Sequence, residues 1–174
     1  MGVWSKIKHY IRVTRSLQNL KQNKDRAVPL TICGQEGWAY VDRVYDGDSC
    51  TLRVMWNHTS VIVKCRLVGI DTPELRGEQR AAGLIARDYV RDRIDKTYVW
   101  YQCTGVDKYG RSLVHLYEAS HHDTRKVDLS ESLNEHLSKV GIARKYTGGS
   151  RSYWNVEQYV AKHTDGQPSQ MNVI

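Results

Sequence analysis

Short runs of apolar residues begin near Gly37 and continue to about Tyr117. They are rich in β-branched and aromatic residues and have about the length of a strand, which is typical of β structure. Turn-forming pairs such as Asp46-Gly47 and Asn57-His58 separate them. The pattern predicts five strands, over residues 38–45, 49–56, 61–70, 98–104 and 112–117.

Apolar residues three and four positions apart predict three helices. The first covers 78–94, between the third and fourth strands. For the second helix, Asp128 is the predicted N-cap with Glu131 three residues later, and Gly141 is predicted to end it. Its apolar face consists of Leu129, Leu133, Leu137 and Val140. A shorter third helix is predicted over 155–162.

The order of the predicted elements indicates the fold. A chain of 174 residues has room for one compact domain. We therefore expect a mainly β fold with α: a five-stranded OB-fold β-barrel with about three α-helices over residues 31–163. Residues 1–30 precede it, and 164–174 form a polar tail that we expect to be flexible. OB barrels often accept oligonucleotides, but a fold alone does not establish a function.

The segment before the barrel carries most of the net charge of +7. Its first 26 residues hold seven basic side chains and one acidic side chain, whereas the remainder is nearly neutral. Apolar residues at helical spacing predict a basic amphipathic helix there. Contact with a membrane surface, organelle targeting, and a solvated arm or an extra helix all stay open. Lipidation of Gly2 also stays open, although Lys6 stands where myristoylation favours Ser or Thr.

The sequence disfavours a membrane-spanning protein, a secreted protein and a zinc site. No stretch approaches the roughly 18 apolar residues of a membrane span. No secretory signal peptide is evident, so we expect an intracellular location. The cysteines lack zinc-ligand spacing, and Cys50, Cys65 and Cys103 lie in or beside predicted strands, where we expect buried thiols. His121-His122-Asp123 has metal-binding residue types, yet its polar setting favours a solvated loop.

Three motifs gather reactive polar residues at the ends of predicted strands. Carboxylates that approach one another repel by roughly 4 kcal/mol at about 4 Å and intermediate dielectric, so such a cluster needs a cation. Calcium suits two aspartates plus a main-chain oxygen near Thr72. Glu74 is then a candidate general base for water. The motifs are Asp46-Gly47-Asp48-Ser49, the segment from Arg66 to Glu74 that includes Asp71-Thr72-Pro73, and Asp107-Lys108-Tyr109-Gly110-Arg111.

Two arginines, Arg66 and Arg111, match the chemistry of phosphate. A planar guanidinium binds two oxygens at once and stays charged at any working pH. Together with a dication, two such groups neutralise the charge that develops on a pentacoordinate phosphorus. Arg66 and Asp71 are five residues apart and would face opposite sides of a regular strand, so they converge only if the strand bends or ends, as Gly69 permits.

These motifs, in this order and at these separations, resemble the staphylococcal nuclease (thermonuclease) family over approximately residues 38–161. The resemblance implies that Ca²⁺ is bound by Asp48, Asp71 and the carbonyl of Thr72. It implies that Glu74 orients or deprotonates the attacking water. The implied phosphate-binding catalytic residues are Arg66 and Arg111.

The resemblance also implies the reaction: endo- and exonucleolytic cleavage of DNA or RNA, preferentially single-stranded, that leaves 3′-phosphate ends. Lys108 and Tyr109 would contact a neighbouring phosphate. Tyr146, displaced by one position from the aromatic residues of the family, is a candidate contact to a base. We expect a monomer. The loop after Glu74 is shorter than in the secreted bacterial enzyme, and Ser49 stands where Thr is common.

Two other hypotheses belong to different classes. The first is a noncatalytic nucleic-acid- or protein-binding module of the same fold. The second is a membrane-tethered interaction protein in which the N-terminal helix has the main role. The complete set of candidate metal-binding and catalytic residues favours an active nuclease, because a module released from catalysis is expected to lose at least one of them.

Overall fold

The computed structural model describes residues 31–120, 126–149 and 153–164. The chain divides between Thr31 and Ile32, and the fold below is that of the unit beginning at Ile32. The predicted N-terminal helix, Gly2, the 121–123 loop and the tail from residue 165 lie outside the described residues. Within the described ranges, no helix is long and apolar enough to cross a membrane.

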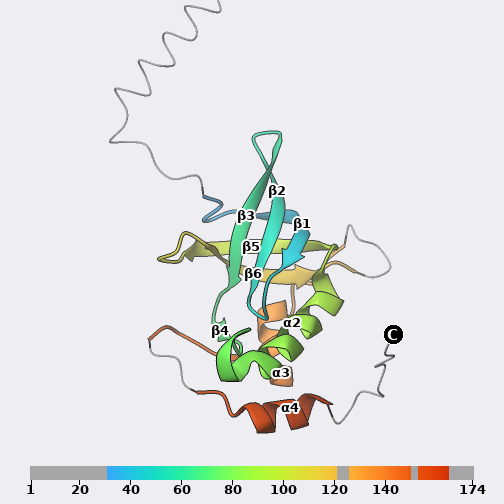
Figure 1. The fold of residues 1–174 in the computed structure, drawn as a ribbon. Coiled ribbons are helices and arrows are strands. Elements are labelled where there is room, and N and C mark those ends of the chain that lie inside the picture. Colours follow the sequence, from blue (N-terminus) through green and yellow to red (C-terminus); the bar gives the residue numbers. More distant parts are fainter. Residues whose placement is uncertain (1–30, 121–125, 150–152, 165–174) are drawn as a thin grey trace, which may run out of the picture. The chain divides into compact units, whose positions relative to one another are not determined.

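Five strands close into a barrel in the order β1-β2-β3-β6-β5 (Figure 1). Neighbouring strands are antiparallel except β3 and β6, which are parallel. With three α-helices among the described residues, the predicted mainly β class with an OB-type barrel is confirmed. The barrel strands are β1 (Glu36–Val44), β2 (Ser49–Trp56), β3 (Thr59–Leu67), β5 (Tyr98–Val106) and β6 (Ser112–Glu118).

Alternate side chains of these strands fill the barrel interior. Cys50 faces Cys65 across the β2–β3 ladder, and both are buried. All four cysteines are free thiols, and Cys50, Cys65 and Cys103 are buried, as predicted for these three. Burial raises the pKa of Cys50 to about 12, so this group stays protonated and behaves as part of the apolar core. The fully buried neighbours include Val41, Leu52, Val99 and Leu116.

The three α-helices of the described residues gather at one end of the barrel (Figure 1). The first, α2 (Arg80–Ile94), follows the short 3-10 turn η2 (Gly77–Gln79) and contacts β1. The second, α3 (Leu133–Val140), packs on β6. The third, α4 (Val156–Thr164), packs on α2. The helices therefore cover the end where β1 leads into β2.

The N-cap predicted for α3 is wrong. Ser132, not Asp128, caps the helix: its Oγ accepts a hydrogen bond from the N–H of Glu135 at 3.2 Å. Glu135 Oε2 in turn accepts from the N–H of Ser132 at 2.8 Å, which completes a capping box. Asp128 instead accepts from the N–H of Ser130 in the preceding turn. Gly141 ends the helix in the left-handed conformation, as predicted.

A second ladder consists of two short strands, β4 (Ile70–Asp71) and β7 (Arg144–Lys145). The sequence predicted one strand over 61–70 where β3 ends at Leu67 and β4 begins at Ile70, and it did not predict β7. They are antiparallel, and Asp71 lies opposite Arg144. The ladder joins the chain after β3 to the chain after α3. It therefore brings a distant segment alongside a predicted metal ligand.

The buried side chain of Asn134 reinforces this connection. Its amide nitrogen donates to the carbonyl oxygens of Val68 at 2.9 Å and Val114 at 3.0 Å. Its amide oxygen accepts from the N–H of Leu116 at 3.2 Å. Asn134 therefore ties α3 to β6 and to the chain between β3 and β4.

Candidate active site

The chain bends between Arg66 and Asp71, as their convergence requires. β3 ends at Leu67, and Gly69 has a φ of 79°, in the left-handed region that glycine favours. Because the strand ends there, strand alternation no longer separates the two side chains. Arg66 Nη2 lies 3.2 Å from the carbonyl oxygen of Ile70 and 3.8 Å from Asp71 Oδ1.

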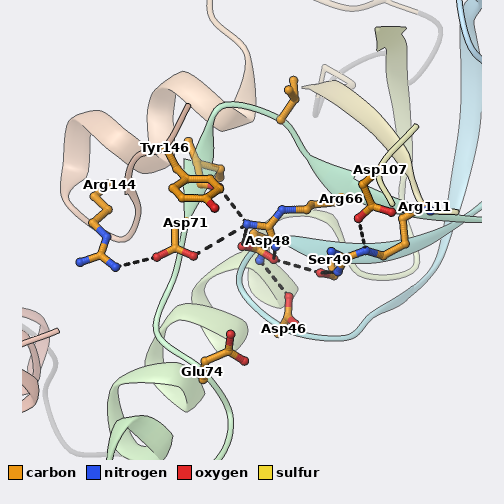
Figure 2. Close-up of polar contacts among 12 residues, drawn as sticks. Asp46, Asp48, Ser49, Arg66, Asp71, Glu74, Asp107, Arg111, Arg144 and Tyr146 are labelled. Atoms are coloured by element: carbon orange, nitrogen blue, oxygen red, sulfur yellow. Dashed lines mark hydrogen bonds and ion pairs between the residues drawn. The ribbon is translucent and has the colours of Figure 1, made fainter. Parts of the chain in front are cut away.

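Asp48 reaches the same guanidinium from the turn between β1 and β2 (Figure 2). Arg66 Nη1 lies 3.0 Å from Asp48 Oδ1, and Nη2 lies 2.9 Å from Oδ2. Exposed fractions are 4% for Asp48, 7% for Arg66 and 1% for Asp71, so all three charges are removed from water. The structure thus brings together two predicted metal ligands and one predicted phosphate-binding arginine.

Burial governs the protonation of Asp48. Removal from water and the nearby charge of Asp46 raise its pKa to about 7, although Arg66 and the hydroxyl of Ser49 act in the opposite direction. A further cation at this carboxylate would favour its charged form. A proton and a cation would therefore compete for this carboxylate.

The turn that carries Asp48 packs tightly against Thr72. A methyl group at Gly47 would lie 2.8 Å from Thr72 Oγ1 and 2.9 Å from the Cβ of Ala86, so only glycine fits. The main chain between Asp46 and Asp48 is therefore in contact with the residue that follows Asp71. The three predicted metal ligands lie in two segments that touch.

This donor set fits a hard divalent cation such as calcium. Over the described ranges, no group of three or more His, Cys, Asp or Glu side chains is placed to hold a metal ion. The predicted set, however, uses only two carboxylates and a main-chain carbonyl oxygen, and calcium accepts such oxygen ligands in loose geometry, with water completing the shell. The buried oxygens of Asp48 and Asp71 supply the negative charge that the ion requires.

Arg111 joins the cluster through Ser49. Its Nη1 donates to Ser49 Oγ at 3.2 Å, and that hydroxyl donates to Asp48 Oδ1 at 3.0 Å. Asp107 holds Arg111 by an ion pair of 2.8 Å between Nε and Oδ2. Partial burial raises the pKa of Asp107, but hydrogen bonds from the main chain and side chain of Arg111 outweigh this and lower it overall. Arg111 is thus fixed beside the buried cluster.

Lys108 and Tyr109 lie at the exposed tip of the same loop. Tyr109 is 73% exposed, and its N–H donates to Asp107 Oδ1 at 2.9 Å. Its ring centroid lies 5.1 Å from Lys108 Nζ and 5.6 Å from the Cζ of Arg111. These two predicted substrate contacts are therefore neighbours of Arg111 at the surface.

Glu74 and Tyr146 occupy two further sides of the site (Figure 2). Glu74 is half-buried, its N–H donates to Gln79 Oε1 at 3.1 Å, and its side chain is directed towards Asp46 and Asp48. The N–H of Tyr146 donates to the carbonyl oxygen of Gly69 at 2.9 Å. The bend between Arg66 and Asp71 thus also positions Tyr146.

The domain is similar in sequence to a known family. A family model described as staphylococcal nuclease homologue matches residues 64–172, more than half of the chain. The chain belongs to the staphylococcal nuclease family. Among curated proteins, none matches the chain. The domain is therefore a nuclease-family or nucleic-acid-binding module.

The matched range contains most of the candidate residues but starts after Asp48 and Ser49. The structure of the staphylococcal nuclease domain connects the two parts, because Ser49 lies opposite Arg66 in the β2–β3 ladder. Asp48 precedes β2 directly, so this register places it against Arg66. The geometry thus extends the site beyond the matched residues.

One charged residue of the staphylococcal nuclease domain was not among the sequence candidates. Arg144 Nη2 lies 2.8 Å from Asp71 Oδ2. No spacing rule pairs two residues so far apart in the chain. The available signal was a pair of basic residues, Arg144 and Lys145, directly before the candidate Tyr146.

Proposed function

We propose that this protein is a calcium-dependent nuclease that hydrolyses phosphodiester bonds of DNA, RNA or both. The observation that carries the proposal is the convergence of the buried Asp48 and Asp71 on Arg66. Arg111, joined to this cluster through Ser49, supplies a second guanidinium. Membership of the staphylococcal nuclease family supports the reaction class.

Asp48, Asp71 and the carbonyl of Thr72 would hold the calcium ion, which supplies two positive charges for a phosphate when bound. Once the carboxylates have a second cation as partner, Arg66 shares its donors with phosphate oxygens. Arg111, oriented by Asp107, provides the second guanidinium for phosphate oxygens. The two guanidiniums then neutralise the extra charge on the pentacoordinate phosphorus.

Glu74 acts as the general base and takes one proton from a water molecule. The water oxygen forms a bond to phosphorus while the bond to the 5′ oxygen of the next nucleotide breaks. The leaving oxygen takes a proton from solvent, and Glu74 releases its own proton to solvent, which restores the base. The products are a 3′-phosphate and a 5′-hydroxyl, so atoms and charges balance.

Single strands are the proposed substrates. Lys108 and Tyr109 are exposed beside Arg111 and suit a neighbouring phosphate, while Tyr146 suits a base. Contacts to phosphates and to ring faces carry little sequence information, so we expect weak sequence preference.

One observation favours a second candidate function, a noncatalytic binding module of the same family. Guanidinium groups already balance both buried carboxylates, because Arg66 pairs with Asp48 and Arg144 pairs with Asp71. Such a cluster can be purely structural, because removal of one partner would leave the other charge buried and uncompensated.

An assay of the purified full chain separates the two candidates. A 5′-labelled single-stranded DNA and an RNA of the same sequence are incubated with calcium or with a calcium chelator. We expect cleavage with calcium, loss of cleavage in chelator, and 3′-phosphate ends. Binding without cleavage in either condition favours the noncatalytic module, and cleavage that persists undiminished in chelator contradicts the metal mechanism.

A further inference from the structure

The two carboxylate oxygens of Asp71 face different arginines. Arg144 Nη2 lies 2.8 Å from Oδ2, whereas Oδ1 faces Arg66 Nη2 at 3.8 Å. The β4–β7 register places the two residues opposite each other. We propose that Arg144 is a positioning residue that holds Oδ2 of Asp71 and thereby presents Oδ1 to the cation site.

Arg144 is itself held in place by contacts on other sides. Its Nη1 donates to the carbonyl oxygen of Tyr153 at 3.3 Å. Its Cζ lies 4.3 Å from the ring centroid of Trp154, which in turn packs edge-on against the buried Tyr159 of α4. A planar guanidinium can make these contacts at once, whereas an ammonium cannot. The segment before α4 therefore holds Arg144 in place, and Arg144 in turn orients Asp71.

The orientation of the Asp71 carboxylate matters for metal binding. A carboxylate rotates about its Cβ–Cγ bond, and Asp71 is only 1% exposed, so solvent does not compensate a badly placed oxygen. Without Arg144, the guanidinium of Arg66 would draw Asp71 towards itself. Oδ1 of Asp71 would then pair with Arg66 and would no longer be available to the cation. This inference rests on the proposed calcium-dependent function.

Two substitutions separate positioning from simple charge effects. Arg144→Met removes a positive charge, which on charge grounds alone would tighten calcium binding. If positioning dominates, the same change instead weakens calcium binding by roughly tenfold, the size expected for loss of a hydrogen bond to a charged group. Arg144→Lys keeps the charge but loses the planar guanidinium with its paired N–H donors. We therefore expect a dissociation constant for calcium between those of wild type and Arg144→Met. Lys145→Met, the exposed neighbour in β7, makes the same charge change and is the matched control.

The experiment is calorimetric titration of the full chain and its variants with calcium, together with kcat and KM on single-stranded DNA. We expect calcium affinity to fall in the order wild type, Arg144→Lys, Arg144→Met, with kcat at saturating calcium following the same order and KM changing less than about twofold. Lys145→Met should match wild type. Calcium binding that is unchanged or tighter in Arg144→Met overturns the inference.

A further variant covers the case in which Arg144→Met does not fold. Trp154→Leu leaves Arg144 and Asp71 intact but removes the ring that holds the guanidinium. We expect weaker calcium binding in the same direction as Arg144→Lys, and an unchanged dissociation constant contradicts the proposal. If the wild-type chain binds no calcium, both this inference and the proposed function are wrong. If it binds calcium and cleaves DNA while Arg144→Met binds as tightly as wild type, only this inference is wrong.

Discussion

Gly83 of α2 packs directly against the main chain of Glu74. A methyl group at Gly83 would lie 2.3 Å from the carbonyl oxygen of Glu74 and 3.0 Å from the nitrogen of Leu75. Neither atom belongs to a flexible side chain that can move aside. The first turn of α2 therefore sets how closely the proposed general base approaches the rest of the site.

The first prediction concerns Gly83→Ala. The added methyl group should displace the main chain of Glu74 and lower kcat by at least tenfold, because a misplacement of about 1 Å can cost about 10²-fold in rate. Stability should also fall, by about 1–3 kcal/mol for an overpacked site. Gly105→Ala is the control: a methyl group there would meet only Leu113 Cδ1, at 3.7 Å. Equal kcat values for the two variants and wild type would show that this contact does not position Glu74.

The second prediction concerns pH and stability without calcium. Because the pKa of Asp48 is about 7 in the folded state and near its ordinary value of 3.8 in the unfolded state, the folded state binds more protons between these values. The free energy of unfolding should therefore fall as pH rises from about 4 to 7, by a few kcal/mol at most. Urea denaturation in chelator at several pH values measures this slope.

Asp48→Asn provides the comparison for this slope. The amide does not ionise, so the fall in stability between pH 4 and 7 should largely disappear in the variant. If both proteins show the same slope, Asp48 is charged in the folded state throughout this range and its pKa is not raised.

The third prediction concerns the buried side chain of Asn134. Asn134→Ala would leave the carbonyl oxygens of Val68 and Val114 and the N–H of Leu116 without this partner. We expect a loss of about 2–4 kcal/mol in the free energy of unfolding. Lys139→Ala, in the same helix but exposed, should change it by less than about 0.5 kcal/mol. Chemical denaturation of both variants checks the difference, and similar values would remove Asn134 from this role.

The fourth prediction concerns Asp107, which orients Arg111. Asp107→Asn keeps an acceptor for the loop main chain but loses the ion pair with Arg111 Nε. We expect KM for single-stranded DNA to rise by about fivefold, in line with a partly exposed charge-assisted contact. Asp42→Asn removes a more exposed pair with Arg53 outside the site and should leave KM unchanged. Steady-state kinetics that show the same KM for both would indicate that Arg111 needs no orienting partner.

Much of the barrel and the centre of the site could be predicted from the sequence. Strand-length apolar runs and turn pairs located the barrel strands, because these signals are local. The bend at Gly69 was required by the spacing of Arg66 and Asp71, and glycine is the residue that adopts it. Local rules located these features because their causes lie within a few residues.

The N-cap of α3 shows where local rules fail. Both Asp128 with Glu131 and Ser132 with Glu135 have the spacing of a capping box. Burial decides between them: Leu133 and Leu137 are packed in the core, whereas Leu129 is 48% exposed. The sequence pattern alone could not rank two equivalent caps.

The contributions of Arg144, Gly83 and Asn134 were not predictable for a related reason. Arg144 acts on Asp71 and Asn134 on the chain around Val68, both distant in the sequence, whereas Gly83 acts on Glu74, which lies outside its own helix. Such pairs depend on how helices dock against the barrel. Their residue types carry no signal of the partner until the fold is known.

The most direct test of the account is the turnover of Glu74→Gln at saturating calcium, measured under single-turnover conditions with single-stranded DNA. The amide cannot take a proton from water, so we predict a fall in the cleavage rate of at least 10²-fold, with calcium and substrate affinities within about twofold of wild type. Glu78→Gln, four residues away on the exposed surface, should cleave at the wild-type rate. A Glu74→Gln protein that cleaves as fast as wild type would contradict the proposed hydrolytic site.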